Sequence, residues 1–372
     1  MPDVPGGAIE QSVRMRLLLA TVLAVGGTPA AAAPPTLSLS PPPGPLPVGV
    51  TSMYLRDDSR PDPWAPERRR ELMVSLWYPA AAPVTATAPY VTPRESELIL
   101  QGLNRTEVPP EALSTVRTNA GPDVAPSPRR APLVVLSPGF TLPRSSLTGL
   151  AEHLASRGYL VAGIDHAYES FALTFPDGRV VTCAACETDD HAKVIRGRAA
   201  DVSFVLDSLL ARGSAWRGLI DPRRIAMAGH SIGGASAVAA MQADRRIDAG
   251  ADLDGSLFVP PAGLDRPFLL LGSELDHLPG RDDHWDEGWP QLTGWKRWIT
   301  VAGTAHFSFV DYPELADQAG GVEPGLITGA RSTQITGVYL SAFLDRHLRH
   351  VPSPLLAGPS PRFPEVTFHN PR

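Results

Sequence analysis

Cysteine is scarce in this 372-residue chain, which contains only Cys183 and Cys186. A zinc site would need two further ligands at suitable spacing, and the C-x-x-C pair lacks the sequence context of a redox enzyme. We therefore expect a local disulfide, as is typical of exported proteins. We also expect no bound metal and no cofactor.

A strong excess of positive charge is also missing. The formal net charge is −6, and no Lys/Arg-rich run offers a stripe for binding phosphates. This argues against nucleic acid as the main partner. Beyond the N-terminal segment, no stretch approaches the roughly 18 uninterrupted apolar residues of a transmembrane helix. Nothing in the sequence indicates the oligomeric state.

The first 33 residues have the pattern of an export signal. Arg14 and Arg16 precede the apolar run 17–27, and small residues follow at 31–33. The run is too short to span a bilayer, which favours cleavage near Ala33 over a membrane anchor. The sequence thus predicts a secreted protein.

The rest of the chain divides by composition. Residues 34–47 are Pro-rich and read as an extended leader, residues 48–350 as one catalytic domain, and residues 351–372 as a C-terminal tail. From residue 132 onward, short apolar runs alternate with amphipathic stretches. Strands are expected at 133–136, 159–164, 225–228, 250–253, 268–272 and 298–301, and helices at 147–157, 199–212, 232–242 and 333–348. This alternation predicts an α/β fold with a mostly parallel sheet covered by helices on both faces.

The segment GHSIGG places Ser231 between a predicted strand and a predicted helix. In the G-x-S-x-G pattern, a sharp turn exposes the serine hydroxyl beside a base, and the glycines allow close approach of the backbone. The alternative is a helix-capping serine in a Gly-rich turn. The flanking strand and helix favour the nucleophile.

A serine nucleophile needs a histidine base and a carboxylate that orients it. His306 follows the last predicted parallel strand, in the order usual for this fold. Two carboxylates follow earlier strands, Asp254 and Asp276, and their positions in the sequence do not choose between them.

Backbone N–H groups should hold the developing oxyanion. One is expected from Ile232, directly after the nucleophile, and the other from Phe140, in the loop Ser-Pro-Gly-Phe-Thr after an early strand. Apolar residues such as Phe258 and Phe307 flank the candidate acid and base. They suit an apolar ester, although buried loop hydrophobes are equally common.

Several segments together resemble the plasma-type (isoform II) platelet-activating-factor acetylhydrolases, a family of α/β-hydrolases. They are PLVVLSPGFTLPRSSLTGLAEHLASRGYLVAGID, GHSIGG, LDGSLF and GTAHFSF, and the resemblance covers roughly residues 45–350. It implies a calcium-independent serine esterase that removes short or oxidised acyl groups from phospholipids, with transient contact at a lipid interface. The family's L-D-x-x-x-F pattern implies Asp254 as the acid.

The oxyanion loop departs from that family, which has S-H-G-L where this chain has Ser137-Pro138-Gly139-Phe140. Ser-Pro-Gly-Phe-Thr is similar to the loop of bacterial cutinases and polyester hydrolases. Their acid lies about where Asp276 stands, so this second resemblance implies the other carboxylate.

These features predict a serine carboxylic-ester hydrolase acting on lipid esters. A cutinase, polyester hydrolase or general lipase is the alternative within the same chemistry. A non-catalytic binding module on a decayed hydrolase fold is disfavoured by the intact serine, histidine and glycines. A peptidase is disfavoured because no second domain restricts access.

Overall fold

A computed structural model describes residues 36–321 and 323–371, so the predicted signal peptide lies outside the described residues. The strands are β1 (Val48–Pro61), β2 (Arg69–Pro79), β3 (Gly121–Pro122), β4 (Ala131–Ser137), β5 (Leu160–His166), β6 (Leu173–Thr174), β7 (Val180–Val181), β8 (Ile220–His230), β9 (Ala249–Leu253), β10 (Phe268–Ser273), β11 (Lys296–Val301) and β12 (Val366–His369). All except the small β6–β7 pair form one ten-stranded sheet.

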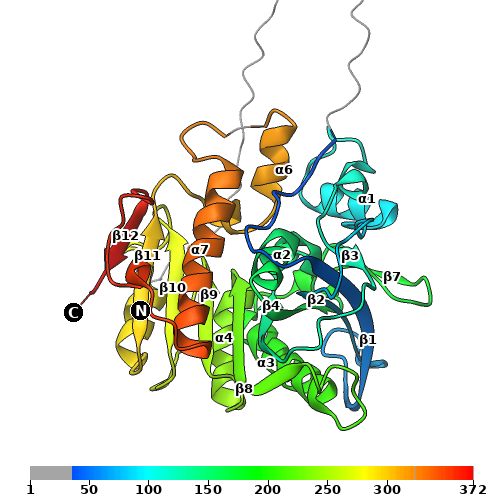
Figure 1. Cartoon of the computed structure of the whole chain (residues 1–372), viewed down its shortest axis with the longest axis horizontal. Helices are drawn as coiled ribbons and strands as arrows, with labels where there is room; N and C mark the ends of the chain where they lie inside the picture. Colours follow the sequence, from blue (N-terminus) through cyan, green and yellow to red (C-terminus); the bar gives the residue numbers. More distant parts are fainter. Residues whose placement is uncertain (1–35, 322, 372) are drawn as a thin grey trace, which may run out of the picture. The chain divides into compact units, whose positions relative to one another are not determined.

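The strand order in this sheet is β12-β11-β10-β9-β8-β4-β5-β2-β1-β3, which can be followed from the red to the blue side of Figure 1. Strands from β5 through β4 and β8 to β11 pair in parallel. The antiparallel pairs β2–β5, β1–β2 and β11–β12 lie toward the two edges. The predicted α/β class with a mostly parallel sheet is therefore confirmed.

Helices cover both faces of the sheet. They are α1 (Pro93–Gly102), α2 (Thr148–Ser156), α3 (His191–Leu210), α4 (Ile232–Ala243), α5 (Asp283–Gly288), α6 (Tyr312–Gln318) and α7 (Gly329–Leu348). Alternate residues of β4 enter two different hydrophobic clusters: Leu133 and Val135 pack with α3 and α4, whereas Val134 and Leu136 pack with α2 and α7. This alternation follows from the two-residue period of a strand.

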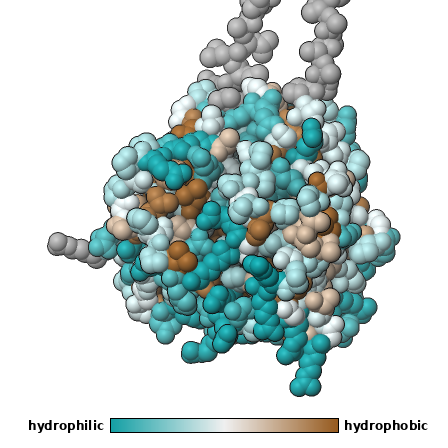
Figure 2. Space-filling model, in the orientation of Figure 1, coloured by the Kyte–Doolittle hydropathy of each residue, from teal (hydrophilic) through white to brown (hydrophobic). Residues whose placement is uncertain are grey.

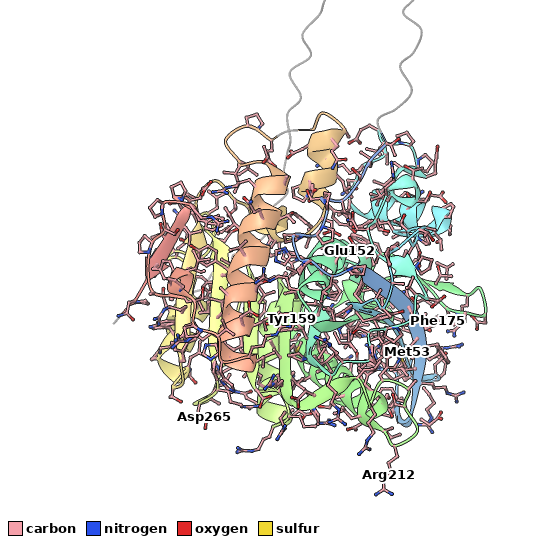
Figure 3. The ribbon with its side chains drawn as sticks, viewed as in Figure 1. Met53, Glu152, Tyr159, Phe175, Arg212 and Asp265 are labelled. Carbon is pink, nitrogen blue, oxygen red and sulfur yellow. A yellow bond between two sulfur atoms is a disulfide. The ribbon has the colours of Figure 1, made fainter. Side chains whose placement is uncertain are left out.

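Polar contacts also join the elements on the α2–α7 face. Tyr159, which is labelled in Figure 3, directly precedes β5. Its hydroxyl donates a hydrogen bond to Asp345 of α7 at 2.7 Å. His153 of α2 lies 3.0 Å from the hydroxyl of Ser341, also on α7. On the face seen in Figure 2, hydrophobic side chains lie mostly in separate patches among hydrophilic ones. No helix in the described part of the chain combines the length and apolar character needed to cross a membrane.

Both ends of the described chain differ from what composition suggests. The expected leader is anchored: Leu37 and Leu39 are buried, and the Leu39 N–H donates to the carbonyl of Arg117 at 3.0 Å. The expected tail contains β12, which pairs with β11 at the edge of the sheet. Both segments are too short and too rich in proline for their pairing to be visible in the sequence.

Helix α3 begins at His191, eight residues before the predicted start at Ala199. Asp190 caps it by accepting the N–H of Lys193 at 2.8 Å. Cys183 and Cys186 form a disulfide in the loop that leads into this helix.

Candidate active site

Ser231 lies in the sharp turn between β8 and α4. Its φ of 56° is in the left-handed region, which is unusual for a residue with a side chain and is typical of strained functional turns. The turn packs tightly against the end of β4, because a Cβ atom on Gly233 would lie 2.1 Å from the Ser137 carbonyl oxygen. Gly233, two residues after the serine, is therefore required by the approach of a neighbouring backbone.

A chain of hydrogen bonds joins Ser231 to His306 and Asp254. The His306 Nε2 atom lies 3.0 Å from the Ser231 hydroxyl, and its Nδ1 atom lies 2.7 Å from Asp254 Oδ2. Asp254 is fully buried, whereas 41% of the His306 side chain is exposed. The imidazole therefore connects a buried carboxylate with a hydroxyl at the surface, the arrangement that activates a serine.

Asp254 is ionised in these surroundings. Burial opposes the charge, but the hydrogen bond with His306 and the nearby His277 hold the pKa of this carboxyl below its ordinary value. The His277 Nε2 atom lies 3.5 Å from Asp254 Oδ1. An ionised acceptor fixes the His306 proton on Nδ1 and leaves Nε2 free to accept the serine proton.

The second carboxylate considered from the sequence, Asp276, lies apart from this chain. It is half-buried and accepts a hydrogen bond from the Ser273 hydroxyl at 3.1 Å. Among the described residues, it makes no hydrogen bond with His306. The structure thus brings Asp254, and not Asp276, to the imidazole.

Two further histidines lie beside the triad: His230, which the sequence does not mark as functional, and His277, which competes in the sequence with His306 as the candidate base. The His230 ring lies 4.6 Å from the His306 ring, and its Nε2 atom is 2.8 Å from the His306 carbonyl oxygen. Burial and the adjacent His306 lower the pKa of His230 to about 3, so this imidazole is neutral. His277 stacks on Trp285 and bonds Asp282 at 2.8 Å.

The two expected oxyanion donors flank the elbow. Ile232 is the first residue of α4, so its N–H has no acceptor within the helix. Within the described part of the chain, the Phe140 N–H has no hydrogen-bond acceptor either. The loop of Phe140 lies close to the elbow, because a Cβ atom on Gly139 would be 2.7 Å from His230 Nδ1.

A second Ser–His–Asp chain lies beneath that loop. The Ser137 hydroxyl is 3.0 Å from His166 Nε2, and His166 Nδ1 is 2.7 Å from Asp201 Oδ2. All three side chains are buried, and Ser137 belongs to strand β4. Because the Ser137 side chain has no exposed surface for a substrate to contact, we assign the set to the scaffold.

Aromatic rings surround one side of the site. Phe140, His191, Phe258 and His284 form a continuous row, in which neighbouring ring centroids are 6.4, 4.7 and 4.7 Å apart. Phe258 and Phe307 are among the large apolar side chains that remain exposed. This row can contact a flat or apolar part of a substrate.

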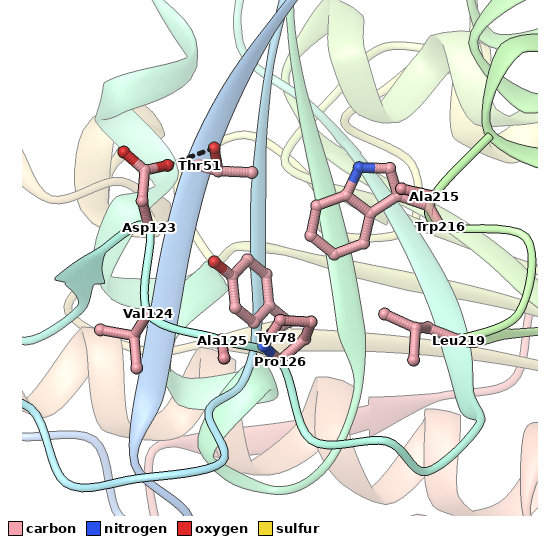
Figure 4. Close-up of a pocket in the computed structure, with 9 residues that line it drawn as sticks. All are labelled: Thr51, Tyr78, Asp123, Val124, Ala125, Pro126, Ala215, Trp216 and Leu219. Carbon is pink, nitrogen blue, oxygen red and sulfur yellow. Dashed lines mark hydrogen bonds between the residues drawn. The ribbon is translucent and has the colours of Figure 1, made fainter.

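The remaining features do not belong to this site. Within residues 36–321 and 323–371, no cluster of three or more His, Cys, Asp or Glu side chains is arranged to hold a metal ion. A shallow hollow is lined by residues that include Tyr78 and Trp216 (Figure 4). Its lining residue Leu219 directly precedes β8, so the hollow lies at the end of the sheet opposite Ser231.

Comparison with known proteins shows similarity to solved structures over most of the chain. A ferulic acid esterase from Streptomyces cinnamoneus is 45% identical to the chain, with a TM-score of 0.81. The match covers 90% of this chain and 100% of that one. No protein-family model matches the chain.

Curated relatives match over shorter stretches. A probable 1-alkyl-2-acetylglycerophosphocholine esterase from Arthroderma benhamiae is 30% identical, over 64% of this chain and 66% of its own length. Cutinase est2 from Thermobifida alba is 27% identical, over 47% of this chain and 52% of its own length. The chain thus spans between half and two thirds of these relatives, and both resemblances noted in the sequence are to proteins that it matches.

Proposed function

Because the chain belongs to the serine esterases of the α/β-hydrolase type, we propose that Ser231, His306 and Asp254 are its catalytic triad. The observation that carries this proposal is the continuous hydrogen-bonded chain from the surface hydroxyl to the buried carboxylate. The competing set at Ser137 is enclosed by the sheet and has no access to substrate.

The reaction has two steps. The Ser231 oxygen attacks the ester carbonyl carbon while its proton passes to His306 Nε2, and His306 then protonates the departing alcohol. This leaves an acyl group on Ser231. Water, deprotonated by His306, attacks the acyl carbon, and His306 returns that proton to the leaving Ser231 oxygen as the acid is released. Asp254 keeps the imidazole oriented and stabilises its charged form throughout.

The N–H groups of Phe140 and Ile232 hold the carbonyl oxygen as it becomes negative. Neither N–H has another acceptor among residues 36–321 and 323–371, which supports this role, since a donor that is already bonded could not serve the oxyanion. One such donor contributes about 3 kcal/mol to transition-state stabilisation in hydrolases of this kind.

For the substrate, we propose lipid esters with a short acyl chain, as in 2-acetyl phospholipids. The relative from A. benhamiae and the sequence resemblance to the acetylhydrolases support this class. Exposed Phe258 and Phe307 beside the site can contact a lipid interface transiently.

Esters of aromatic acids are the second candidate. The aromatic row from Phe140 to His284 favours them, because it offers stacking contacts to a planar acid. The ferulic acid esterase relative supports the same class. The sequence resemblance to cutinases and polyester hydrolases extends this candidate to polyesters.

A labelling experiment tests the triad. A fluorophosphonate probe should label the wild-type chain at Ser231 and abolish hydrolysis of an activated acetyl ester, and Ser231→Ala should neither be labelled nor turn over. Ser137→Ala is the matched control and should still be labelled. Full turnover by Ser231→Ala would refute the assignment.

A substrate panel then separates the two classes. It compares a 2-acetyl phospholipid, long-chain esters, methyl ferulate and a polyester film by kcat/KM. A preference for the acetyl phospholipid supports the first class, and a preference for methyl ferulate supports the second.

Export is a further part of the proposal. The Cys183–Cys186 disulfide fits an oxidising compartment outside the cytoplasm. Detection of the mature protein in the culture medium, beginning near residue 34, would support it.

A further inference from the structure

A buried ion network lies directly beneath the loop that carries Phe140. Arg198, on α3, is 1% exposed, and its Nη1 atom donates to both the Pro138 carbonyl and the Ser137 hydroxyl. Its Nε atom donates to Glu169 Oε2 at 2.7 Å. One guanidinium therefore joins the start of the loop to a buried carboxylate.

The other end of the same loop is held by the same glutamate. The Thr141 N–H donates to the Glu169 carbonyl oxygen at 2.9 Å, and the Thr141 carbonyl accepts from the Phe171 N–H at 2.7 Å. Thr141 has a φ of 72°, an unfavourable conformation that these bonds maintain. Glu169 thus fixes the loop through its backbone at one end and through Arg198 at the other.

Between these two anchors lies a flexible residue. Gly139 has no room for a side chain beside His230, so the loop must use the residue with the greatest backbone freedom. The Phe140 N–H belongs to the peptide that follows Gly139. The carbonyl of that same peptide accepts the Leu142 N–H at 3.2 Å, and the Arg198 bond to the Pro138 carbonyl restrains the peptide on the other side of Gly139. The two bonds together limit the rotation about Gly139 that would turn the Phe140 N–H away from the reacting oxygen.

We propose that Arg198 is a positioning residue that orients the oxyanion loop. This inference rests on the proposed function, because it gives Arg198 a role in a reaction carried out at Ser231. Arg198 does not touch substrate; it acts through the Pro138 carbonyl on the direction of the Phe140 N–H.

The second Ser–His–Asp chain supports this role. Burial and the neighbouring Arg198 charge lower the pKa of His166, which favours its neutral form. With its Nδ1–H donated to the Asp201 carboxylate, His166 accepts a hydrogen bond from the Ser137 hydroxyl at Nε2. The Ser137 oxygen is then left as an acceptor for Arg198. This Ser–His–Asp set thereby makes Ser137 an acceptor, and not a donor, toward the Arg198 guanidinium.

Arg198→Lys tests the proposal. A lysine keeps the charge but cannot bond Glu169 and the Pro138 carbonyl with a fixed planar fork. Arg70→Lys is the matched control: Arg70 is equally buried and bonds Glu169 and Asp201, but it makes no hydrogen bond to residues 137–141. Turnover is measured per active site titrated with fluorophosphonate, alongside KM and the inhibition constant of a trifluoromethyl ketone.

We expect Arg198→Lys to lower kcat and weaken ketone inhibition by about 100-fold each, the loss typical of a misplaced catalytic group, while KM changes little. Arg70→Lys should lower thermal stability and leave kcat per titrated site near the wild-type value. Equal kcat in the two variants would overturn the proposal, because a merely structural residue alters only the folded fraction.

Glu169→Gln serves if Arg198→Lys does not fold. It is isosteric and keeps the Thr141 backbone bond, but weakens the anchor of Arg198, so we expect a loss in kcat of about 10-fold. A kcat equal to that of Arg70→Lys would again overturn the proposal. An unlabelled, inactive wild-type chain would instead refute the proposed function itself.

Discussion

The carboxylate that orients His306 can be identified by single substitutions. Asp254→Asn keeps the shape of the side chain but presents the wrong partner to Nδ1, so we expect kcat to fall by about 10³- to 10⁴-fold. Asp276→Asn should stay within about threefold of wild type, since no step of the reaction uses it. Steady-state hydrolysis of an activated acetyl ester measures both.

Thermal unfolding of the two variants is the control for this comparison. Both variants should keep the wild-type unfolding midpoint within a few degrees, because Asp276 is half-buried and asparagine fills the Asp254 site. The reverse result, with Asp276→Asn inactive and Asp254→Asn active, would show that the acid acts from the other strand.

At the scale of residues, the sequence predicts those site residues that a local sequence pattern identifies. Ser231 is marked by its glycines, and His306 by its place after a late strand. The choice between Asp254 and Asp276 stays open in the sequence because both follow parallel strands at the same edge. His230 and Arg198 are not marked at all, since their roles arise from contacts between distant segments.

At the scale of elements, buried charged residues interrupt the apolar periodicity by which a helix is recognised in a sequence. Helix α3 is predicted to begin at Ala199 because Arg196 and Arg198 interrupt the apolar stripe ahead of it. In the structure, Arg198 faces the interior and its charge is matched by Glu169. The first two turns of this helix therefore contribute Val194, Ile195 and Arg198 to the interior, although the charged residues make their sequence look polar.

The C-terminal strand β12 is also missed by the sequence analysis, in this case because the segment is short. β12 contributes the backbone edge that pairs with β11, and Phe363 just before it is 1% exposed against Tyr339, with ring centroids 5.5 Å apart. A four-residue strand after a Pro-rich stretch has too little pattern to be recognised. Its packing nevertheless makes it part of the hydrophobic core.

Phe363→Ala should therefore destabilise the whole domain. Removing a buried phenylalanine costs about 3–5 kcal/mol, and we expect a loss of this size in the free energy of unfolding in urea. Thr367→Ala, on the exposed side of β12, is the control and should change stability little. If both variants unfold at the wild-type urea concentration, the C-terminal segment is not part of the cooperative core.

At the scale of the whole molecule, buried carboxyl groups couple stability to pH. Asp311 is 2% exposed and accepts the Gly149 N–H from α2 and the Tyr90 hydroxyl from the N-terminal part of the chain. Burial raises the pKa of Asp311 well above its ordinary value, and the nearby Glu314 and Glu152 add to the rise. The Asp311 carboxyl thus connects its own segment with α2 and with the segment of Tyr90, and its burial disfavours its ionised form.

The sign of the effect follows from proton uptake. Between the pKa of Asp311 in the unfolded chain and its higher pKa in the native state, the native protein binds more protons. The contribution of this group to stability is complete below the unfolded pKa and is lost as the pH rises toward the folded pKa. The loss amounts to about 1.4 kcal/mol for each pH unit within that range.

Asp311→Asn removes this titration while keeping an oxygen for Gly149 and a polar partner for Tyr90. The variant should therefore gain stability relative to wild type between pH 5 and pH 8, measured as the difference in the free energy of unfolding in urea. Asp58→Asn changes a carboxylate whose side chain is 73% exposed, so its difference from wild type should stay constant over the same range. A constant difference for Asp311→Asn as well would mean that Asp311 is already ionised in the native protein at pH 5. In that case its contacts with Gly149 and Tyr90, and not its burial, would govern its charge.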